Sequence, residues 1–199
     1  HFWKQLEGHD IDVSYSWTKA LLHEAGLVKR GVKRKAYRRR REREPMAGLM
    51  VHLDGSKHRW FASDDGAQQD LLAFVDDATG ELLFPMFVPE ESTSTVLAVL
   101  RDLVRERGTF GRLYVDRASH FVHTPRAGEA PDRTKKTQVE RVLDELGIEL
   151  VCAFSPQARG RSERIWRTLQ GRLPRELARL DITTYAAANA YVRGRFLGR

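Results

Sequence analysis

The order of apolar segments along the chain restricts its fold more than any other feature. Three strand-like segments follow one another at residues 49–53, 71–75 and 82–88, with polar stretches between them. Beyond them the apolar spacing changes to that of amphipathic helices, and these helices alternate with short strands. Three strands followed by such alternation predict a mixed sheet covered by helices.

Helices are expected where apolar residues recur at intervals of three and four positions between a capping residue and a glycine. The first such helix follows Ser92 or Thr93 and ends before Gly108. The second ends before Gly147, and the third is expected over residues 161–179. This spacing places two helices within the alternating part of the chain and one after it.

Two strands and a last helix complete the prediction. Strands are expected at residues 113–115 and 148–154, and Thr183 or Thr184 caps the last helix. Pro174 predicts a kink in the third helix, because proline lacks the N–H that the helix would use.

The second and third strands are close enough for a hairpin. The turn between them, at residues 77–80, has the sequence DATG, and glycine is typical of such turns. Pro85 places the third strand at an edge or a bulge, since it cannot donate to a neighbour.

Residues 1–28 are interpreted as the end of a small helical unit. A helix capped by Ser14 or Ser16 runs to Ala25 and is stopped by Gly26. Its expected apolar face consists of Trp17, Leu21 and Leu22. The pattern resembles the last helix of a helix-turn-helix, and a generic short helix is the alternative.

Positive charge is concentrated in a linker, residues 29–47, that precedes a core at 48–199. Residues 29–43 hold ten Lys or Arg and one Glu, whereas the whole chain has a net charge of +7. Focused charge of this kind is typical of segments that bind DNA, and a merely solvated linker is the alternative. The linker residues expected to contact DNA are Lys33, Arg34, Lys35, Arg38, Arg39, Arg40 and Arg41.

Composition limits the cellular setting. With 199 residues and 41% apolar residues, the chain can build one domain and a smaller piece. Its apolar runs are shorter than the ~18 residues of a membrane span, and its start has no signal-peptide pattern. Because it begins at His1 without Met, it is expected to be part of a longer or trimmed protein. The single Cys152 suits the cytoplasm and predicts a buried thiol rather than a nucleophile.

Several carboxylates stand where an α/β sheet gathers its reactive groups, at the carboxyl ends of strands. Asp54 and Asp116 each follow an expected strand, and Glu163 lies two residues into the third helix. Asp76 and Asp77 also follow a strand. On position alone they compete equally with Asp116.

Four stretches resemble the integrase-core transposases of bacterial insertion sequences, a family that shares its core fold with retroviral integrases. They are residues 53–61 (LDGSKHRWF), 74–80 (FVDDATG), 114–121 (YVDRASHF) and 155–164 (SPQARGRSER). The match spans roughly residues 48–197, and its order and spacing are more specific than any single motif. The resemblance implies an α/β fold of the ribonuclease-H-like class, with a mixed five-stranded sheet flanked by helices.

The resemblance also implies roles for the acids. Asp54, Asp116 and Glu163 would be the metal ligands, and Asp76 and Asp77 would be structural acids of the hairpin turn. Three converging carboxylates repel one another, and two Mg²⁺ ions, or Mn²⁺ in their place, relieve that repulsion. Such a pair of ions can activate the attacking oxygen and stabilise the leaving oxygen of a phosphodiester.

Further residues are expected around the three acids. His58 and His120 each follow an acid of the triad by four positions. They could contact the scissile phosphate or the attacking water. The alternative is that they lie just outside the metal ligands or at the surface. Arg159, Arg161 and Arg164 could contact phosphates. Trp60 and Phe61 are expected in the core.

The function implied is that of a metal-dependent polynucleotidyl transferase that cleaves transposon ends and joins them to target DNA. Double-stranded DNA and a dimer or larger assembly are the expected partners, in the bacterial cytoplasm at the nucleoid. Two departures from the family pattern stand out. Trp166 occupies a position where related transposases often have Asn. Gly194-Arg195-Phe196 stands where the final helix of the family often has an Asn followed by Arg-Arg-Phe. A catalytically silent DNA-binding module and a ribonuclease-H-like nuclease are the alternatives.

Overall fold

The computed structural model describes residues 13–28, 42–62, 66–123, 135–153 and 162–196, and the chain divides into two compact units, His1–Arg40 and Arg41–Arg199. In the first unit, α2 (Tyr15–Glu24) begins after Ser14, whose hydroxyl accepts a hydrogen bond from the backbone of Trp17. The predicted helix is confirmed. Two residues of its expected apolar face, Trp17 and Leu21, are exposed, and Thr18 is the buried residue of the helix.

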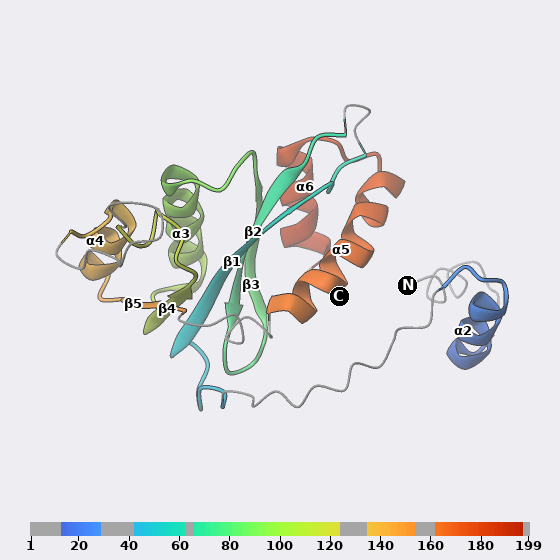
Figure 1. Cartoon of the computed structure of the whole chain (residues 1–199), viewed down its shortest axis with the longest axis horizontal. Helices are drawn as coiled ribbons and strands as arrows, with labels where there is room; N and C mark the ends of the chain where they lie inside the picture. The colour runs from blue at the N-terminus through green and yellow to red at the C-terminus, as the bar shows by residue number, and fades with distance from the viewer. Residues whose placement is uncertain (1–12, 29–41, 63–65, 124–134, 154–161, 197–199) are drawn as a thin grey trace. The chain divides into compact units, whose positions relative to one another are not determined.

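The second unit is built on the predicted mixed sheet, which is confirmed (Figure 1). The strands lie in the order β3-β2-β1-β4-β5. β1 pairs antiparallel with β2 and β2 with β3, whereas β1 pairs parallel with β4 and β4 with β5. Their bounds are β1 (Met50–His58), β2 (Gln69–Asp76), β3 (Leu82–Val88), β4 (Arg112–Val115) and β5 (Glu149–Cys152).

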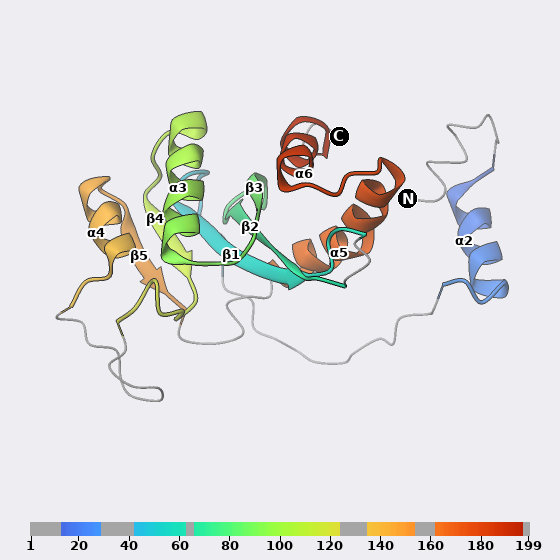
Figure 2. The same ribbon diagram turned by 90° about the horizontal axis from the view of Figure 1, so that it is seen from above.

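Helices cover both faces of the sheet (Figure 2). On one face lie α3 (Thr93–Arg107) and α4 (Gln138–Glu145), and on the other lie α5 (Ser162–Arg179) and α6 (Tyr185–Tyr191). The predicted last helix changes at its end, since α6 passes into a π-helical turn, η2 (Val192–Phe196). α5 continues past Pro174, where one backbone hydrogen bond is lost.

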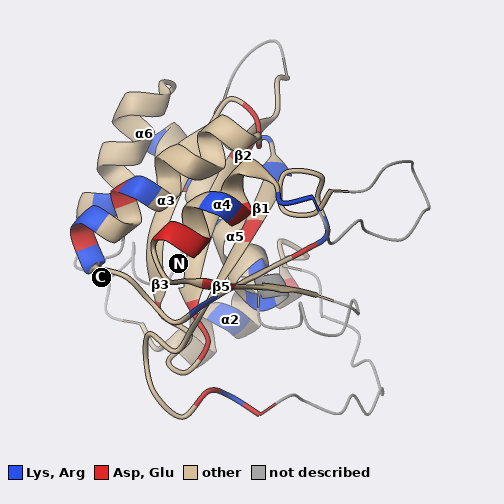
Figure 3. Ribbon diagram, turned by 90° about the vertical axis from the view of Figure 1, so that its left-hand side faces the viewer, with Lys and Arg blue, Asp and Glu red and all other residues tan. Residues whose placement is uncertain are grey.

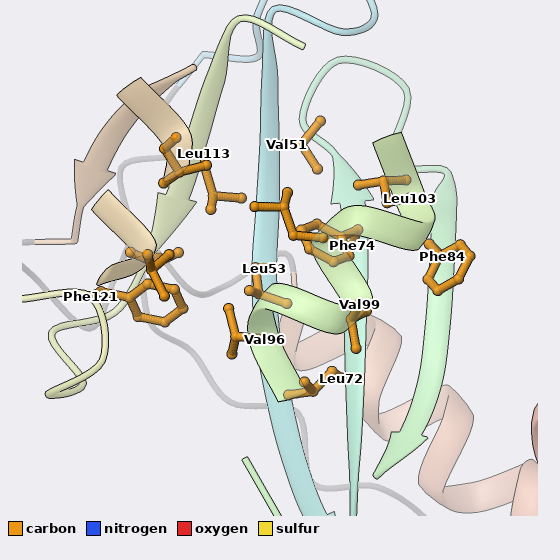
Figure 4. Packing of buried hydrophobic residues seen from close by; sticks show 14 of the residues in the cluster. Val51, Leu53, Leu72, Phe74, Phe84, Val96, Val99, Leu103, Leu113 and Phe121 are labelled. Carbon is orange, nitrogen blue, oxygen red and sulfur yellow. The ribbon is translucent and has the colours of Figure 1, made fainter. Parts of the chain in front are cut away.

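Two buried clusters hold the helices to the sheet. Side chains alternate along a strand, so Leu72 and Phe74 face α3 while Leu71 and Ala73 face α5 and α6. Figure 4 shows the first cluster, where Phe74 and Leu53 of the sheet pack against α3. The second cluster contains Trp60 and Phe61, as predicted, together with Trp166, Leu169, Leu173, Leu177, Ala188, Tyr191 and Val192. No helix within the described residues is long and apolar enough to cross a membrane.

The edge strand β3 is tied to the last helix by one side chain. The side-chain oxygen of Asn189 accepts the N–H of Phe87 at 2.7 Å, and its NH₂ group donates to the Phe87 carbonyl at 3.0 Å. A buried amide thereby takes the place of a neighbouring strand. The predicted edge position of Pro85 is confirmed, because β3 is the outer strand of the sheet.

The β2–β3 turn holds the start of the second unit. Oδ2 of Asp76 accepts the Gly48 N–H at 2.8 Å, and Oδ1 accepts the Thr79 N–H at 2.8 Å. Oδ2 of the next residue, Asp77, accepts the Glu44 N–H at 2.8 Å. The predicted hairpin is confirmed, and its two acids bind backbone N–H groups of the segment before β1 and of the turn itself.

The pKa of Asp76 lies below its ordinary value of 3.8. Burial alone would raise it, but hydrogen bonds from the backbone of Gly48, Thr79 and Ala78 and from the Thr79 hydroxyl outweigh burial. A carboxylate whose pKa is lowered by folding stabilises the protein above its unfolded pKa. That contribution declines as the pH falls through the folded pKa.

Asp76→Asn is therefore expected to lower the free energy of unfolding at pH 7 by about 1–2 kcal/mol, the scale of a hydrogen bond to a charged group. The difference from the wild type should shrink below the ordinary pKa of 3.8 and vanish below the folded pKa. Urea unfolding across this pH range measures it, with Glu81→Gln at the exposed end of the same turn as the control. A deficit independent of pH would contradict the assignment.

Candidate active site

The parallel pairing of β1 and β4 ends two residues before two of the predicted acids, Asp54 and Asp116. His52 pairs with Tyr114, and their rings lie 4.8 Å apart between centroids. Two positions further along both segments are Asp54 and Asp116. Neighbouring strands are ~4.8 Å apart and side chains alternate every second residue, so these two acids belong to the same side of the sheet.

Asp54 does not end its strand, so that part of the prediction is wrong. β1 continues to pair with β2 beyond Asp54, which is opposite Ala73, whereas β4 ends at Val115. Asp54 therefore lies where the β1–β4 pairing stops. Asp116 begins the loop after β4, and its Oδ1 accepts the Ala118 N–H at 2.9 Å. Among the described residues, no strand pairs with this side of β1 beyond His52.

Helix α5 is fixed along β1 by two polar contacts. Nε1 of Trp166 donates to Oδ2 of Asp54 at 2.9 Å, and the Gln170 amide donates to Oγ of Ser56 at 2.9 Å. Glu163 is the second residue of α5, as predicted, and precedes Trp166 by three positions, which places both on one side of the helix. Its side chain lies outside the described residues.

No described side chains form a cluster of three or more His, Cys, Asp or Glu that could hold a metal ion. These described side chains include those of Asp54 and Asp116 but not that of Glu163. The full set of three acids therefore stays a prediction. The described residues show the register of the strands that lead to Asp54 and Asp116, and the helix that carries Glu163.

A second acid–histidine pair lies against the other side of β1. Nε2 of His120 is 2.9 Å from Oε1 of Glu91, and a Cβ on Gly55 would lie 2.3 Å from the other oxygen of Glu91. A side chain at position 55 would thus displace the carboxylate. His58, the other predicted histidine, has its ring 5.1 Å from that of Trp60.

Three of the residues near these acids were missed in the sequence. Glu91 precedes the Ser92 cap of α3, and nothing local marks it as a partner of His120. The contacts of Trp166 and Gln170 with β1 join segments more than a hundred residues apart. The spacing of these two on one helix face is the only sequence signal for their shared direction.

An open hollow of about 570 Å³ lies beside the Asp54–Trp166 contact, between β1 and α5. It is lined by Gly55, Ser56, Trp166, Arg167, Gln170 and Gly171. Open space lies where a side chain at Gly171 would be, and Arg167 brings a positive charge.

Charge on the described helices differs between the two faces of the sheet. Acidic and basic residues are mixed along α3 and α4 (Figure 3). α5 carries five arginines, whereas its only acids are Glu163 and the buried Glu176. Arg164 is exposed on α5. The other predicted DNA contacts, namely Arg159, Arg161 and the seven residues of the linker, lie outside the described residues.

Asp76 and Asp77, the rival acids of the β2–β3 turn, lie away from Asp54. Asp76 pairs with Val51, near the start of β1, and both of its carboxylate oxygens accept hydrogen bonds. Asp77 is bonded to His52 at 2.6 Å. Their environment is that of structural acids.

Comparison with known proteins relates the chain to transposases. It is 37% identical over 195 residues to "Putative transposase y4bF" of Sinorhizobium fredii, covering 98% of the chain and 41% of that protein. It is 32% identical over 152 residues to "Transposase for insertion sequence IS1202" of Streptococcus pneumoniae, covering 76% of the chain and 32% of that protein. The chain thus spans less than half the length of either relative. No family model matches it.

Solved structures with the same fold are catalytic cores of retroviral integrases. The BIV integrase core has a TM-score of 0.51 and 20% identity, over 74% of this chain and 85% of that one. The HTLV-2 integrase core, solved in complex with magnesium, has a TM-score of 0.56 and 10% identity, over 76% of this chain and 89% of that one. The predicted ribonuclease-H-like fold is therefore confirmed.

Proposed function

Because the chain is related to the transposases of insertion sequences and has the fold of retroviral integrase cores, we propose that it is the catalytic core of a metal-dependent DNA transposase. The observation that supports this proposal is the parallel register of β1 and β4, which, continued two residues past the His52–Tyr114 pair, would bring Asp54 opposite Asp116 beside the helix that bears Glu163. Three carboxylates from separate elements then converge at the open edge of β1.

The donor set suits magnesium. Asp54, Asp116 and Glu163 offer only carboxylate oxygens, which Mg²⁺ prefers, and the open edge leaves room for water and substrate. The three residues would hold two such ions, and Mn²⁺ would substitute for them. Two divalent ions bound there would activate an attacking oxygen and stabilise a leaving oxygen.

The protein's own part is to hold the acids and the DNA strand in place. β1 and α5 fix the orientation of Asp54 through its backbone and through Trp166. The hollow between them would accept the strand next to the scissile phosphate, with Arg167 at a neighbouring phosphate. Water first cleaves at the transposon end and frees a 3′-OH. That hydroxyl then attacks a target phosphodiester, a new P–O bond forms, and the target's 3′ oxygen leaves.

Two transposon ends have to be joined to one target, so the active form is a dimer or a larger assembly on double-stranded DNA. The natural setting is the bacterial nucleoid in the cytoplasm. The basic linker binds the DNA backbone, together with Arg159, Arg161 and Arg164. His58 and His120 lie outside the metal ligands, and His120 is oriented by Glu91.

Neutralising the linker is expected to weaken DNA binding in a salt-dependent manner. Each phosphate contact contributes about 0.9 to the slope of log affinity against log salt. Replacing Arg38, Arg39, Arg40 and Arg41 by Gln should reduce that slope by about 3 to 4. Fluorescence anisotropy at several salt concentrations measures it, with Arg105→Gln and Arg107→Gln on α3 as a control for charge alone. An unchanged slope would favour a solvated linker that does not touch DNA.

The direct test of the function is a joining assay. The protein is incubated with DNA that carries the ends of its own element, a plasmid target, and Mg²⁺ or Mn²⁺. Joined products that require the metal are expected. Degradation of an RNA–DNA hybrid without joining would indicate a nuclease instead, and end binding without cleavage, even by the full-length protein, would indicate a silent DNA-binding module.

A further inference from the structure

We infer that Trp166 is a positioning residue for Asp54. Its indole N–H holds one carboxylate oxygen of Asp54 and so determines how the other oxygen is presented to a divalent ion. The inference rests on the proposed function, since it assigns Trp166 a task within the same metal site.

The contact has the geometry of a strong hydrogen bond. Nε1 of Trp166 lies 2.9 Å from Oδ2 of Asp54, and a bond from an N–H to a carboxylate is shorter and stronger than one between neutral groups. The bond occupies Oδ2 and leaves Oδ1 for other contacts. Asp54 is thus set up to bind an ion through one oxygen rather than two.

The indole itself is held in place. Trp166 is 9% exposed and belongs to the second buried cluster, where its ring lies 6.4 Å from that of Trp60 at an angle of 53°. One helical turn later, the Gln170–Ser56 contact fixes the same face of α5 on the same strand. Rotation of the indole would require repacking of the core. The N–H therefore keeps a constant direction toward Asp54.

The chemistry of indole suits this task. It donates one hydrogen bond, accepts none and carries no charge, so it neither competes for the ion nor repels it as Lys or Arg would. Partners of this kind orient metal ligands, and their loss typically costs about ten- to a hundredfold in metal affinity. Trp166 also couples two ligands, because it joins β1, which carries Asp54, to α5, which carries Glu163 three residues earlier.

The test is a titration with Mn²⁺ in which free ion is followed by electron paramagnetic resonance, so that its readout does not depend on catalysis. Trp166→Phe removes the N–H and keeps an aromatic ring. Trp60→Phe is the matched control, because Trp60 is buried and its Nε1 donates to the Ser56 carbonyl at 3.0 Å on the same strand. Asp54→Asn marks which part of the Mn²⁺ binding belongs to the site.

Trp166→Phe is expected to weaken the Asp54-dependent binding of Mn²⁺ by about ten- to a hundredfold, and Trp60→Phe to change it less than threefold. Thermal unfolding with and without Mn²⁺ should show the same order, since a bound ion raises the melting temperature only where it binds the folded state. If Trp166→Phe does not fold, replacement of Trp166 by benzothienylalanine removes the N–H at nearly constant size and should give the same loss.

The possible outcomes separate the two proposals. Equal Mn²⁺ affinity in the wild type and in folded Trp166→Phe, with binding still lost in Asp54→Asn, would overturn the role of Trp166 and leave the site intact. Equal binding in the wild type and Asp54→Asn would overturn the site itself, and the role of Trp166 with it. Equal losses in Trp166→Phe and Trp60→Phe would show that packing, rather than the N–H, supports the ligand.

Discussion

Replacing Asp116 by Asn is expected to abolish metal-dependent cleavage and joining of DNA while the fold is retained. Oδ1 of Asp116 accepts the Ala118 N–H, and the side-chain oxygen of Asn can accept the same bond. The negative charge that would bind the ion is lost. Since bound ions supply several kcal/mol of transition-state stabilisation, the rate should fall by about a thousandfold or more.

The joining assay measures this loss against a matched carboxylate. Asp102→Asn is the control, because Asp102 lies on α3 and, among the described residues, pairs with its exposed neighbour Arg101, a kind of contact worth little. Its activity should be close to that of the wild type, and circular dichroism should show both variants folded. Wild-type rates from Asp116→Asn would remove Asp116 from the site.

The largest expected loss of stability comes from an ion pair behind the site whose acid is buried and whose arginine is partly exposed. Glu176 is fully buried, accepts a hydrogen bond from Nε of Arg172 at 2.6 Å and is also bonded by the Tyr191 hydroxyl. This group ties α5 to α6. Arg172→Met removes the compensating charge and should lower the free energy of unfolding by about 3–5 kcal/mol.

Urea unfolding tests this expectation with two companions. Arg175→Met changes an exposed arginine on the same helix and should alter stability by less than about 0.5 kcal/mol. The double variant Arg172→Met with Glu176→Leu removes both charges and should recover much of the loss. A loss for Arg172→Met no larger than that for Arg175→Met would show that the buried carboxylate does not depend on the arginine.

The fold was predictable where local patterns and tertiary structure agree. The third strand was expected at residues 82–88 and is β3 (Leu82–Val88), with Pro85 on the edge strand. The helix expected after Ser92 and before Gly108 is α3, and the Ser92 side chain caps it in a capping box with Thr95. For α3, the apolar period, the capping residue and the stop residue all predict the same helix.

The length of β1 could not be predicted in this way. Residues 55–58 are Gly, Ser, Lys and His, which have no apolar alternation, yet they pair with β2 as far as the His58–Gln69 pair. The pairing partner, rather than local composition, extends the strand. Ser56 is buried there, and its hydroxyl oxygen accepts a hydrogen bond from the Gln170 amide.

Part of the candidate site was predictable as well. The sequence nominated Asp54 and Asp116, but on position it could not separate Asp116 from Asp76 or Asp77. Family-like surroundings chose among them, and the structure adds that Asp76 and Asp77 bind the backbone N–H groups of Gly48 and Glu44, before β1, and that Asp77 also binds His52. The contact of Trp166 with Asp54 joins distant segments and has no local signature.

The central claim is that Asp54, Asp116 and Glu163 form one divalent-metal site, and a crystal structure of the protein with Mn²⁺ and end DNA tests it most directly. Anomalous diffraction at the manganese edge locates the ions without reference to activity. Manganese peaks are expected within bonding distance of carboxylate oxygens of all three residues, with a single oxygen of Asp54 as ligand. Manganese bound elsewhere, or no peak among the three acids in a complete complex with DNA, would contradict it.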